Sequence, residues 1–121
     1  MSKRILVVED EEDNRRIVRD LLTSVGYEII EAVTGEEGVQ AAATHLPDLI
    51  LMDIQLPGLD GYETTRQIRT NPALRKVPII AVTSYALSGD DVKAFEAGCD
   101  GYVSKPFSPR ALLAKIREYL P

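Results

Sequence analysis

Polar residues that could do chemistry stand at the ends of short apolar segments of this sequence: Glu9, Asp10, Asp53, Thr83 and Lys105. If these segments are parallel strands of one sheet, their carboxyl ends lie at the same edge, where open α/β sheets bind ligands. Three carboxylates so close together repel one another, and a divalent cation with oxygen ligands relieves that repulsion. Mg²⁺ suits such a site, since it uses one or two carboxylates, keeps waters and often shares a phosphate. The lysine adds a point charge that suits a phosphoryl oxygen.

Each of these residues also has an ordinary structural explanation. Asp10 could cap the helix that follows it, Thr83 could bond to backbone at a strand end, and Lys105 could be a solvated surface lysine. The acidic residues 11–13 fall in the first turn of a helix and favour its dipole, so for them the structural interpretation is preferred. Each explanation is reasonable singly, but together they do not account for polar strand ends that share one edge.

Strands and helices are predicted to alternate along the chain and to position these residues. Apolar runs predict five strands, over residues 5–8, 27–32, 48–52, 77–82 and 101–104. The third is almost wholly apolar and is predicted to be buried on both faces, whereas the second is more polar, as suits an edge strand. Strands that alternate with helices imply parallel βαβ units with right-handed crossovers and helices on both faces of the sheet.

Capping signals predict where the helices begin and end. Four residues are predicted N-caps: Thr34, Asp60, Ser88 and Ser108. Two glycines are predicted to end helices: Gly26 and Gly98.

Helical spacing predicts which side chains of each helix face the sheet. The first helix is predicted to pack through Ile17, Val18, Leu21, Leu22 and Val25. Its solvent side is predicted to carry Arg15, Arg16, Arg19 and Asp20. The second helix is predicted to pack through Val39, Ala42, Ala43 and Leu46.

The composition is that of a single globular domain. The 121 residues contain no internal repeat, low-complexity tract or linker, so residues 1–121 are interpreted as one domain with no output domain. A net charge of −5 argues against non-specific binding to nucleic acid. A single cysteine, Cys99, cannot form an internal disulfide. Together with the lack of a signal peptide or a membrane-length apolar stretch, this predicts a cytoplasmic protein.

Four motifs, in this order, resemble the receiver domain of bacterial two-component response regulators. They are V-V-E-D ending at Asp10, L-M-D-I-Q-L-P-G-L-D-G around Asp53, V-T-S at Thr83 and K-P-F at Lys105. The resemblance extends over the whole chain and is closest to a stand-alone regulator of the chemotaxis type. It implies a flavodoxin-like, doubly wound (βα)5 fold with strand order 2-1-3-4-5.

The resemblance implies a phosphorylation site. Asp53 would accept a phosphoryl group from a histidine kinase, a histidine phosphotransfer protein or a small acyl phosphate. Mg²⁺ would be held by Asp10, Asp53 and the backbone carbonyl of Gln55, with Glu9 acting through bound water. The protein would be no enzyme in the usual sense, although it would assist its own phosphorylation and dephosphorylation.

The resemblance also implies a switch. Lys105 would pair with the Asp53 carboxylate and then with the phosphoryl group, across a cis bond to Pro106. Thr83 would donate its hydroxyl to a phosphoryl oxygen, and the ring of Tyr102 would move inward. A downstream protein would read the face of the fourth helix, fifth strand and fifth helix, in a monomer or a phosphorylation-dependent dimer, with no direct contact with nucleic acid or membrane.

Three alternatives stay open beside this interpretation. A phosphohydrolase of the haloacid dehalogenase type would need an acid two residues after the nucleophile, where this chain has Gln55. A flavodoxin-like electron carrier would need a hydroxyl-rich or glycine-rich loop after the first strand, where this chain has E-D-E-E-D. The chain could also be the receiver of a hybrid kinase or of a longer regulator.

Overall fold

One parallel sheet forms the centre of the molecule. The computed structural model describes residues 2–84 and 90–121. Within them, five strands pair in the order β2-β1-β3-β4-β5. Their bounds are Arg4–Val8 (β1), Glu28–Ala32 (β2), Leu49–Asp53 (β3), Ile79–Thr83 (β4) and Gly101–Ser104 (β5). The predicted α/β class, the parallel pairing and the strand order are confirmed.

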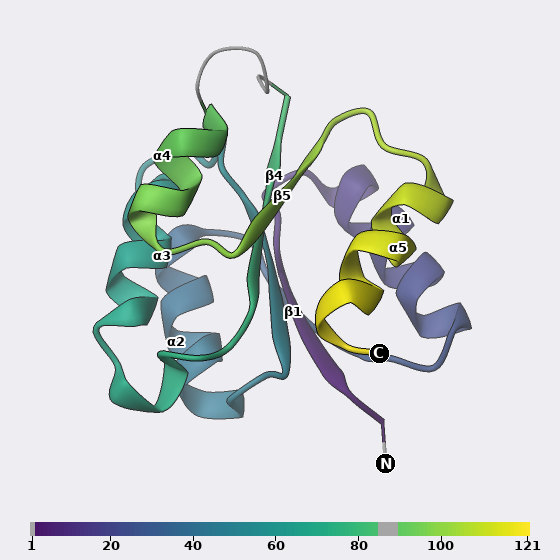
Figure 1. The fold of residues 1–121 in the computed structure, drawn as a ribbon, viewed down its shortest axis with the longest axis horizontal. Helices are drawn as coiled ribbons and strands as arrows, with labels where there is room; N and C mark the ends of the chain where they lie inside the picture. Colours follow the sequence, from purple (N-terminus) through teal and green to yellow (C-terminus); the bar gives the residue numbers. More distant parts are fainter. Residues whose placement is uncertain (1, 85–89) are drawn as a thin grey trace.

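Helices cover both faces of this sheet. Their bounds are Glu12–Ser24 (α1), Gly35–His45 (α2), Gly61–Arg69 (α3), Asp90–Ala97 (α4) and Pro109–Tyr119 (α5). Helices α1 and α5 lie on one face, and α2, α3 and α4 lie on the other (Figure 1). A short 3₁₀ helix, η1 (Pro72–Leu74), was not predicted. In the described part of the chain, no helix is long and apolar enough to cross a membrane.

Alternation along the strands divides the core into two clusters. In β1, Ile5 and Val7 join the cluster under α1 and α5, whereas Leu6 and Val8 join the cluster under α2, α3 and α4. Every residue of β3 is buried, because this central strand is covered on both faces. The outer strand β2 is partly exposed, as its polar sequence predicted.

Three of the four predicted N-caps are confirmed by side-chain hydrogen bonds. The Glu37 N–H donates to Thr34 Oγ1 at 3.1 Å, and the Glu63 N–H donates to Asp60 Oδ1 at 2.9 Å. Ser108 Oγ accepts a hydrogen bond from the backbone N–H three residues later, at 3.1 Å. The fourth, Ser88, lies outside the described residues.

The predicted glycine stops are also confirmed. Gly26 and Gly98 follow the last turns of α1 and α4 with φ angles of 98° and 118°. Glycine adopts these left-handed angles without a steric penalty, so both helices end where the sequence indicates.

The predicted packing faces of the first two helices are partly wrong. In α1, Val18 and Leu22 are buried, but Ile17 is 58% exposed and Val25 is 41% exposed. In α2, Ala42 is buried as predicted, whereas Ala43 and Leu46 are exposed.

The second error has a clear physical cause. Helix α2 buries Gly35, Gly38 and Ala42, and Val39 is partly buried beside them as predicted, whereas Ala43 and Leu46 stay exposed. A Cβ atom on Gly38 would lie 3.0 Å from a methyl group of Val8. The absence of side chains on this face lets α2 approach the sheet closely, which apolar spacing alone does not reveal.

Candidate functional site

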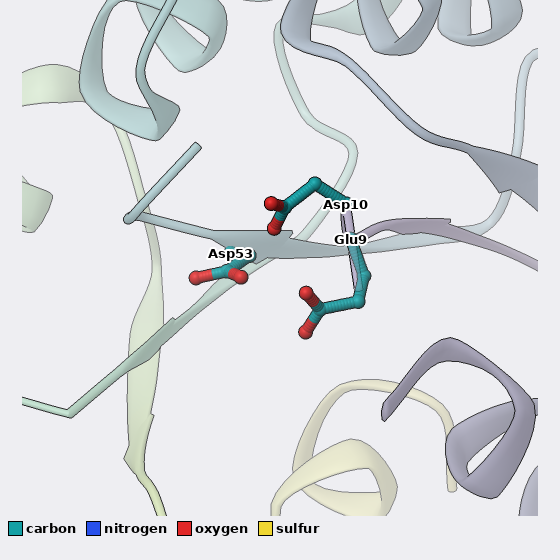
Figure 2. A group of neighbouring side chains, drawn as sticks. All are labelled: Glu9, Asp10 and Asp53. Carbon is teal, nitrogen blue, oxygen red and sulfur yellow. The ribbon is translucent and has the colours of Figure 1, made fainter. Parts of the chain in front are cut away.

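The parallel strands bring the polar strand ends to one edge, as predicted. Carboxylate oxygens of Glu9, Asp10 and Asp53 lie within 4.8 Å of one another. Figure 2 shows the three side chains turned toward a common space. Lys105 Nζ reaches the same group, at 3.1 Å from Glu9 Oε1 and 3.3 Å from Asp53 Oδ2. Thr83 is the last residue of β4 and is buried.

Asp53 is the most enclosed of these acids and is held at both oxygens. It is the last residue of β3, and only 3% of its surface is exposed. Its Oδ1 accepts a hydrogen bond from the Gln55 N–H at 3.0 Å, and its Oδ2 accepts one from Lys105. The start of α3 packs directly against the backbone of Asp53, so closely that a Cβ atom on Gly61 would clash with the Asp53 carbonyl. One carboxylate is thus fixed at the floor of the site.

Glu9 is buried beside Asp53. Its Oε2 accepts a hydrogen bond from the Glu11 N–H at 3.1 Å, while its Oε1 faces Lys105. Burial raises the pKa of Glu9, and the nearby Asp53 carboxylate raises it further; Lys105 and the Glu11 N–H only partly oppose them. The pKa shift follows the crowding of carboxylates that the sequence indicated.

Lys105 carries the opposing charge. Burial alone would lower the pKa of its ammonium group, but the carboxylates of Asp53 and Glu9 outweigh burial and raise it. The described site combines one ammonium group with three carboxylates, so it keeps an excess of negative charge. Oxygen ligands from Glu9, Asp10 and Asp53 at this spacing suit a hard divalent cation such as Mg²⁺. The donor set therefore fits the predicted metal.

The residues of the predicted switch lie on the neighbouring strands β4 and β5. The Lys105 N–H donates to the Thr83 carbonyl at 2.7 Å, which ties the end of β4 to the segment after β5. Tyr102 is partly buried and meets the ring of Phe95 edge-on, with centroids 6.4 Å apart. The Lys105–Pro106 bond is cis, as the resemblance implied.

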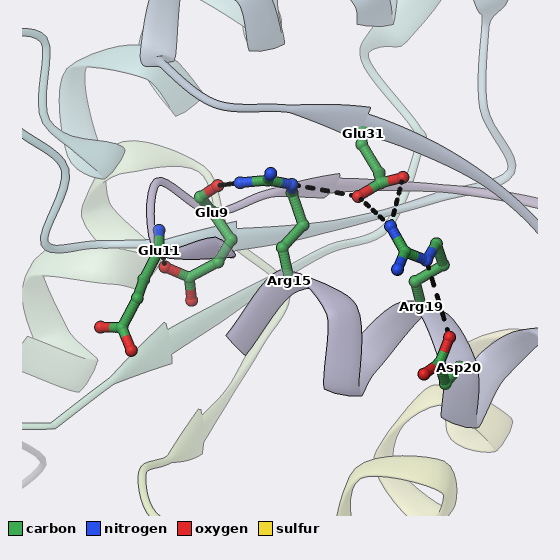
Figure 3. Close-up of polar contacts among 6 residues, drawn as sticks. All are labelled: Glu9, Glu11, Arg15, Arg19, Asp20 and Glu31. Atoms are coloured by element: carbon green, nitrogen blue, oxygen red, sulfur yellow. Dashed lines mark hydrogen bonds and ion pairs between the residues drawn. The ribbon is translucent and has the colours of Figure 1, made fainter. Parts of the chain in front are cut away.

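The sequence did not predict the role of Arg15 in the structure of the site. Expected on the solvent side of α1, its side chain is only 15% exposed. Its Nη1 donates to the Glu9 carbonyl at 3.1 Å and its Nε to Glu31 Oε1 at 3.0 Å (Figure 3). Helical spacing placed Arg15 away from the core, and no local pattern links it to a glutamate on another strand.

A pocket beside Asp53 was also not predicted. It has a volume of about 480 Å³ and extends from Asp53 and Lys105 to apolar side chains of α1 and α5. Ile17, which the sequence assigned to the core, lines this pocket instead. Ser84, directly after Thr83, also lines it.

Comparison with known proteins finds relatives of nearly equal length. The family model of the response regulator receiver domain matches residues 5–117. The polar-differentiation response regulator DivK of Brucella ovis is 43% identical over 120 residues, which cover 99% of this chain and 98% of DivK. DivK of Brucella anthropi shows the same identity and coverage.

Solved structures with the same fold include receiver domains of sensor histidine kinases and separate regulators. The receiver domain of sensor histidine kinase PA1611 from Pseudomonas aeruginosa PAO1 is 38% identical, with a TM-score of 0.93 over 99% of this chain and 98% of that one. That structure has a magnesium ion coordinated in its active-site cleft. Chemotaxis response regulator CheY4 of Vibrio cholerae is 26% identical, with a TM-score of 0.94 over 98% of this chain and 99% of that one.

Proposed function

The chain belongs to the response regulator receiver domain family, and on this premise we propose that Asp53 is its phosphoacceptor. The observation that carries the proposal is the geometry of Asp53, a buried carboxylate at the end of the central strand that faces Lys105 and two further acids. Receiver domains of this family take part in two-component signalling with histidine kinases. The donor proposed here is a phosphohistidine on a kinase or on a phosphotransfer protein.

The reaction proposed is a direct phosphoryl transfer. A carboxylate oxygen of Asp53 attacks the phosphorus atom, and a new O–P bond forms as the N–P bond of the donor breaks. The departing imidazole nitrogen keeps the electron pair of the broken bond and takes up a proton. Lys105 already contacts Asp53 Oδ2, so its ammonium group is placed to follow the phosphoryl oxygens. Attack by water on the phosphorus later returns the carboxylate and inorganic phosphate.

Magnesium is the proposed cofactor. Asp10 and Asp53 would hold it together with the Gln55 backbone carbonyl, and Glu9 would contribute through water. A divalent cation bound there supplies positive charge that offsets the negative charge of the carboxylates and phosphoryl oxygens. The oxygen donor set supports this, as does the magnesium ion in the related PA1611 receiver domain.

We further propose that phosphorylation changes the face formed by α4, β5 and α5. The Thr83 hydroxyl would turn to the phosphoryl group, and the Tyr102 ring would move into the space that it leaves. The burial of Thr83 and the partial burial of Tyr102 on the next strand support this sequence of events. A downstream protein would then distinguish the two states, in a monomer or a phosphorylation-dependent dimer, in the cytoplasm and without direct contact with nucleic acid.

The geometry favours a phosphoacceptor over a phosphohydrolase. A hydrolase of the haloacid dehalogenase type protonates its leaving group with an acid two residues after the nucleophile. Gln55 holds that position, its side chain is exposed, and an amide cannot supply the proton. Under this proposal the protein assists only its own phosphorylation and dephosphorylation.

The test is phosphorylation by acetyl phosphate in the presence of MgCl₂, followed by intact mass. Wild type should gain one phosphoryl group, and Asp53→Asn should gain none. Asp60→Asn is the matched control, because it makes the same chemical change at a helix N-cap where asparagine serves as well as aspartate. An adduct of equal yield on Asp53→Asn would show that another residue is the acceptor.

A further inference from the structure

Two consecutive carboxylates of the site, those of Glu9 and Asp10, approach the same partner, Asp53, at the point where β1 ends. Successive side chains of a strand point to opposite faces. The Glu9 N–H still continues the sheet, donating to the Ala32 carbonyl at 3.0 Å, but the chain bends at Asp10. Figure 2 shows the Glu9 and Asp10 side chains leaving the backbone in different directions, one below and one above the strand ends, with both carboxylates turned toward Asp53. The orientation of the peptide that joins Glu9 to Asp10 therefore decides how both carboxylates meet at Asp53.

Arg15 binds that peptide. Its Nη1 donates to the Glu9 carbonyl oxygen at 3.1 Å. The backbone of α1 accounts for a different carbonyl, since the Arg15 N–H donates to Glu11 at 3.0 Å. The Glu9 oxygen belongs to the planar group that leads into Asp10. A donor that fixes this oxygen therefore fixes the direction in which the Asp10 residue leaves the strand.

A neighbouring strand holds Arg15 in place. Glu31, on β2, accepts from Arg15 Nε at 3.0 Å and from Arg19 Nη1 at 3.3 Å (Figure 3). The Arg15 side chain is 15% exposed, and that of Glu31 is 30% exposed. A guanidinium group is planar, so one bond to Glu31 also sets the direction of the nitrogen that meets Glu9. Strand β2 thus orients Arg15, and Arg15 orients the peptide that joins Glu9 to Asp10.

We propose that Arg15 is a positioning residue that holds the Glu9 and Asp10 carboxylates in the arrangement that binds a divalent cation beside Asp53. Arg15 acts through the backbone and touches neither the proposed metal nor the phosphoryl group. This inference rests on the proposed function, because it assigns a role toward the same metal site.

The direction in which the Kd for Mg²⁺ changes when Arg15 is replaced separates positioning from a simple effect of charge. A cation near a metal site repels Mg²⁺, so the loss of the Arg15 charge alone would tighten binding. The loss of the hydrogen bond to the Glu9 carbonyl would instead free the peptide between Glu9 and Asp10 and weaken Mg²⁺ binding. Partners behind the direct ligands typically change metal affinity by about 10- to 100-fold when they are removed.

The experiment is a calorimetric titration of MgCl₂ into unphosphorylated wild type, Arg15→Met and Arg16→Met, each first shown to be folded by circular dichroism. Arg15→Met should raise the Kd for Mg²⁺ by about 10-fold. Arg16→Met removes the same charge one residue away, from a side chain that is 59% exposed and pairs with Asp13, and should leave the Kd unchanged or slightly lower. An unchanged or lower Kd for Arg15→Met overturns the proposal.

Two further variants complete the test, and the first of them also covers the case in which Arg15→Met does not fold. Arg15→Lys keeps the charge but cannot bond to Glu31 and the Glu9 carbonyl with one rigid fork, so it should also weaken binding, by a smaller factor. A wild-type Kd for Arg15→Lys contradicts positioning. Asp10→Asn separates the two levels of inference. If Asp10→Asn loses Mg²⁺ and both Arg15 variants bind as wild type does, only the role of Arg15 is wrong; if wild type itself binds no Mg²⁺, the proposed metal site fails as well.

Discussion

Lys105 is the residue on which the charge balance of the site depends. Its ammonium group lies 3.1 Å from Glu9 and 3.3 Å from Asp53, so it partly neutralises the negative charge of both carboxylates. A phosphoryl group on Asp53 would compete for this single cation. Glu9 would then keep mainly its hydrogen bond from the Glu11 N–H. The protonation of Glu9 is therefore a sensitive property of the site at the scale of single residues.

Glu9→Gln should change how stability depends on pH. The pKa of Glu9 is raised above its ordinary value of 4.5 by burial and by Asp53, so the folded protein binds this proton more tightly than the unfolded chain does. The stability contributed by that proton is fully present below pH 4.5 and is lost as pH rises through the raised pKa. Lys105 stays charged throughout this range, because its own pKa is raised from 10.5.

Urea unfolding of both proteins in metal-free buffer, at neutral pH and near pH 4.5, measures the effect. Wild type should gain stability relative to Glu9→Gln as the pH falls. A difference in free energy of unfolding that stays constant between the two conditions would contradict the raised pKa of Glu9.

Among the elements, α4 is anchored by few side chains. Ala94 and Ala97 are buried, whereas Val92 is 54% exposed and Phe95 is 49% exposed. The Phe95 ring meets Tyr102 edge-on, so a movement of Tyr102 would be felt directly by α4. Elements with few buried apolar contacts open most readily, which suits α4 to a switch.

Thr83→Ala should separate phosphorylation from the response of α4. The variant keeps Asp53 and Lys105 and should still accept a phosphoryl group. Beryllofluoride, which stands in for that group, should change amide hydrogen exchange between residues 84 and 102 in wild type and far less in Thr83→Ala. If the largest changes fall on α1 and α2 in both proteins, the proposed path from Asp53 to α4 is wrong.

Arg69 joins several elements at the end of the sheet away from the site. Its guanidinium group donates to the carbonyls of Gly98 and Leu74 and to the Asp100 carboxylate, at 3.0, 2.7 and 2.9 Å. These bonds connect α3 with η1 and with the turn between α4 and β5. Arg69→Met would remove this donor from all three acceptors, of which Asp100 Oδ2 would keep its hydrogen bond from the Ile79 N–H.

Arg69→Met should therefore lower the free energy of unfolding by on the order of 3 kcal/mol. Arg66→Met is the control, because Arg66 is on the same helix and 54% exposed, and its ion pair with Glu63 is worth little. Urea unfolding of the two variants gives the comparison, with Mg²⁺-dependent phosphorylation of the folded proteins unchanged. Equal stability of Arg69→Met and Arg66→Met would refute this role.

At the scale of the whole molecule, the carboxylates of Glu9, Asp10 and Asp53 oppose folding, because only the folded state brings these like charges close together. A ligand that binds the folded state alone adds stability in proportion to the logarithm of its concentration. The proposed metal site therefore couples a local event to the stability of the entire domain.

MgCl₂ at 100 times its Kd should stabilise wild type by about 2.7 kcal/mol. Asp10→Asn should lose more of this gain than Glu9→Gln, because Asp10 is the proposed direct ligand and Glu9 acts through water. Urea unfolding with MgCl₂ in calcium-free buffer measures the gain in each protein. The same unfolding in buffer with EDTA is the metal-free reference. A larger loss in Glu9→Gln would reverse the proposed order of the two ligands.

Local residue patterns were enough to predict the elements and the edge at which the site forms. Apolar runs specified the strands, caps such as Asp60 specified where helices begin, and the alternation of strands and helices required parallel pairing. Parallel strands place all their carboxyl ends together, so Asp53 and Lys105 could be assigned to one site before any contact was known. Each of these inferences depends on residues near one another in the chain.

Tertiary structure decided what depends on distant residues. The face of α2 that packs includes Val39, as apolar spacing predicted, but its closest approach to the sheet is set by the missing side chain of Gly38 against Val8. Lys105 meets Glu9 across 96 positions of sequence, and Arg15 meets Glu31 on a separate element. Periodicity and capping describe single helices and strands. They carry no information on which side chains meet when these elements pack, and those contacts set the charge balance and the orientation of the site.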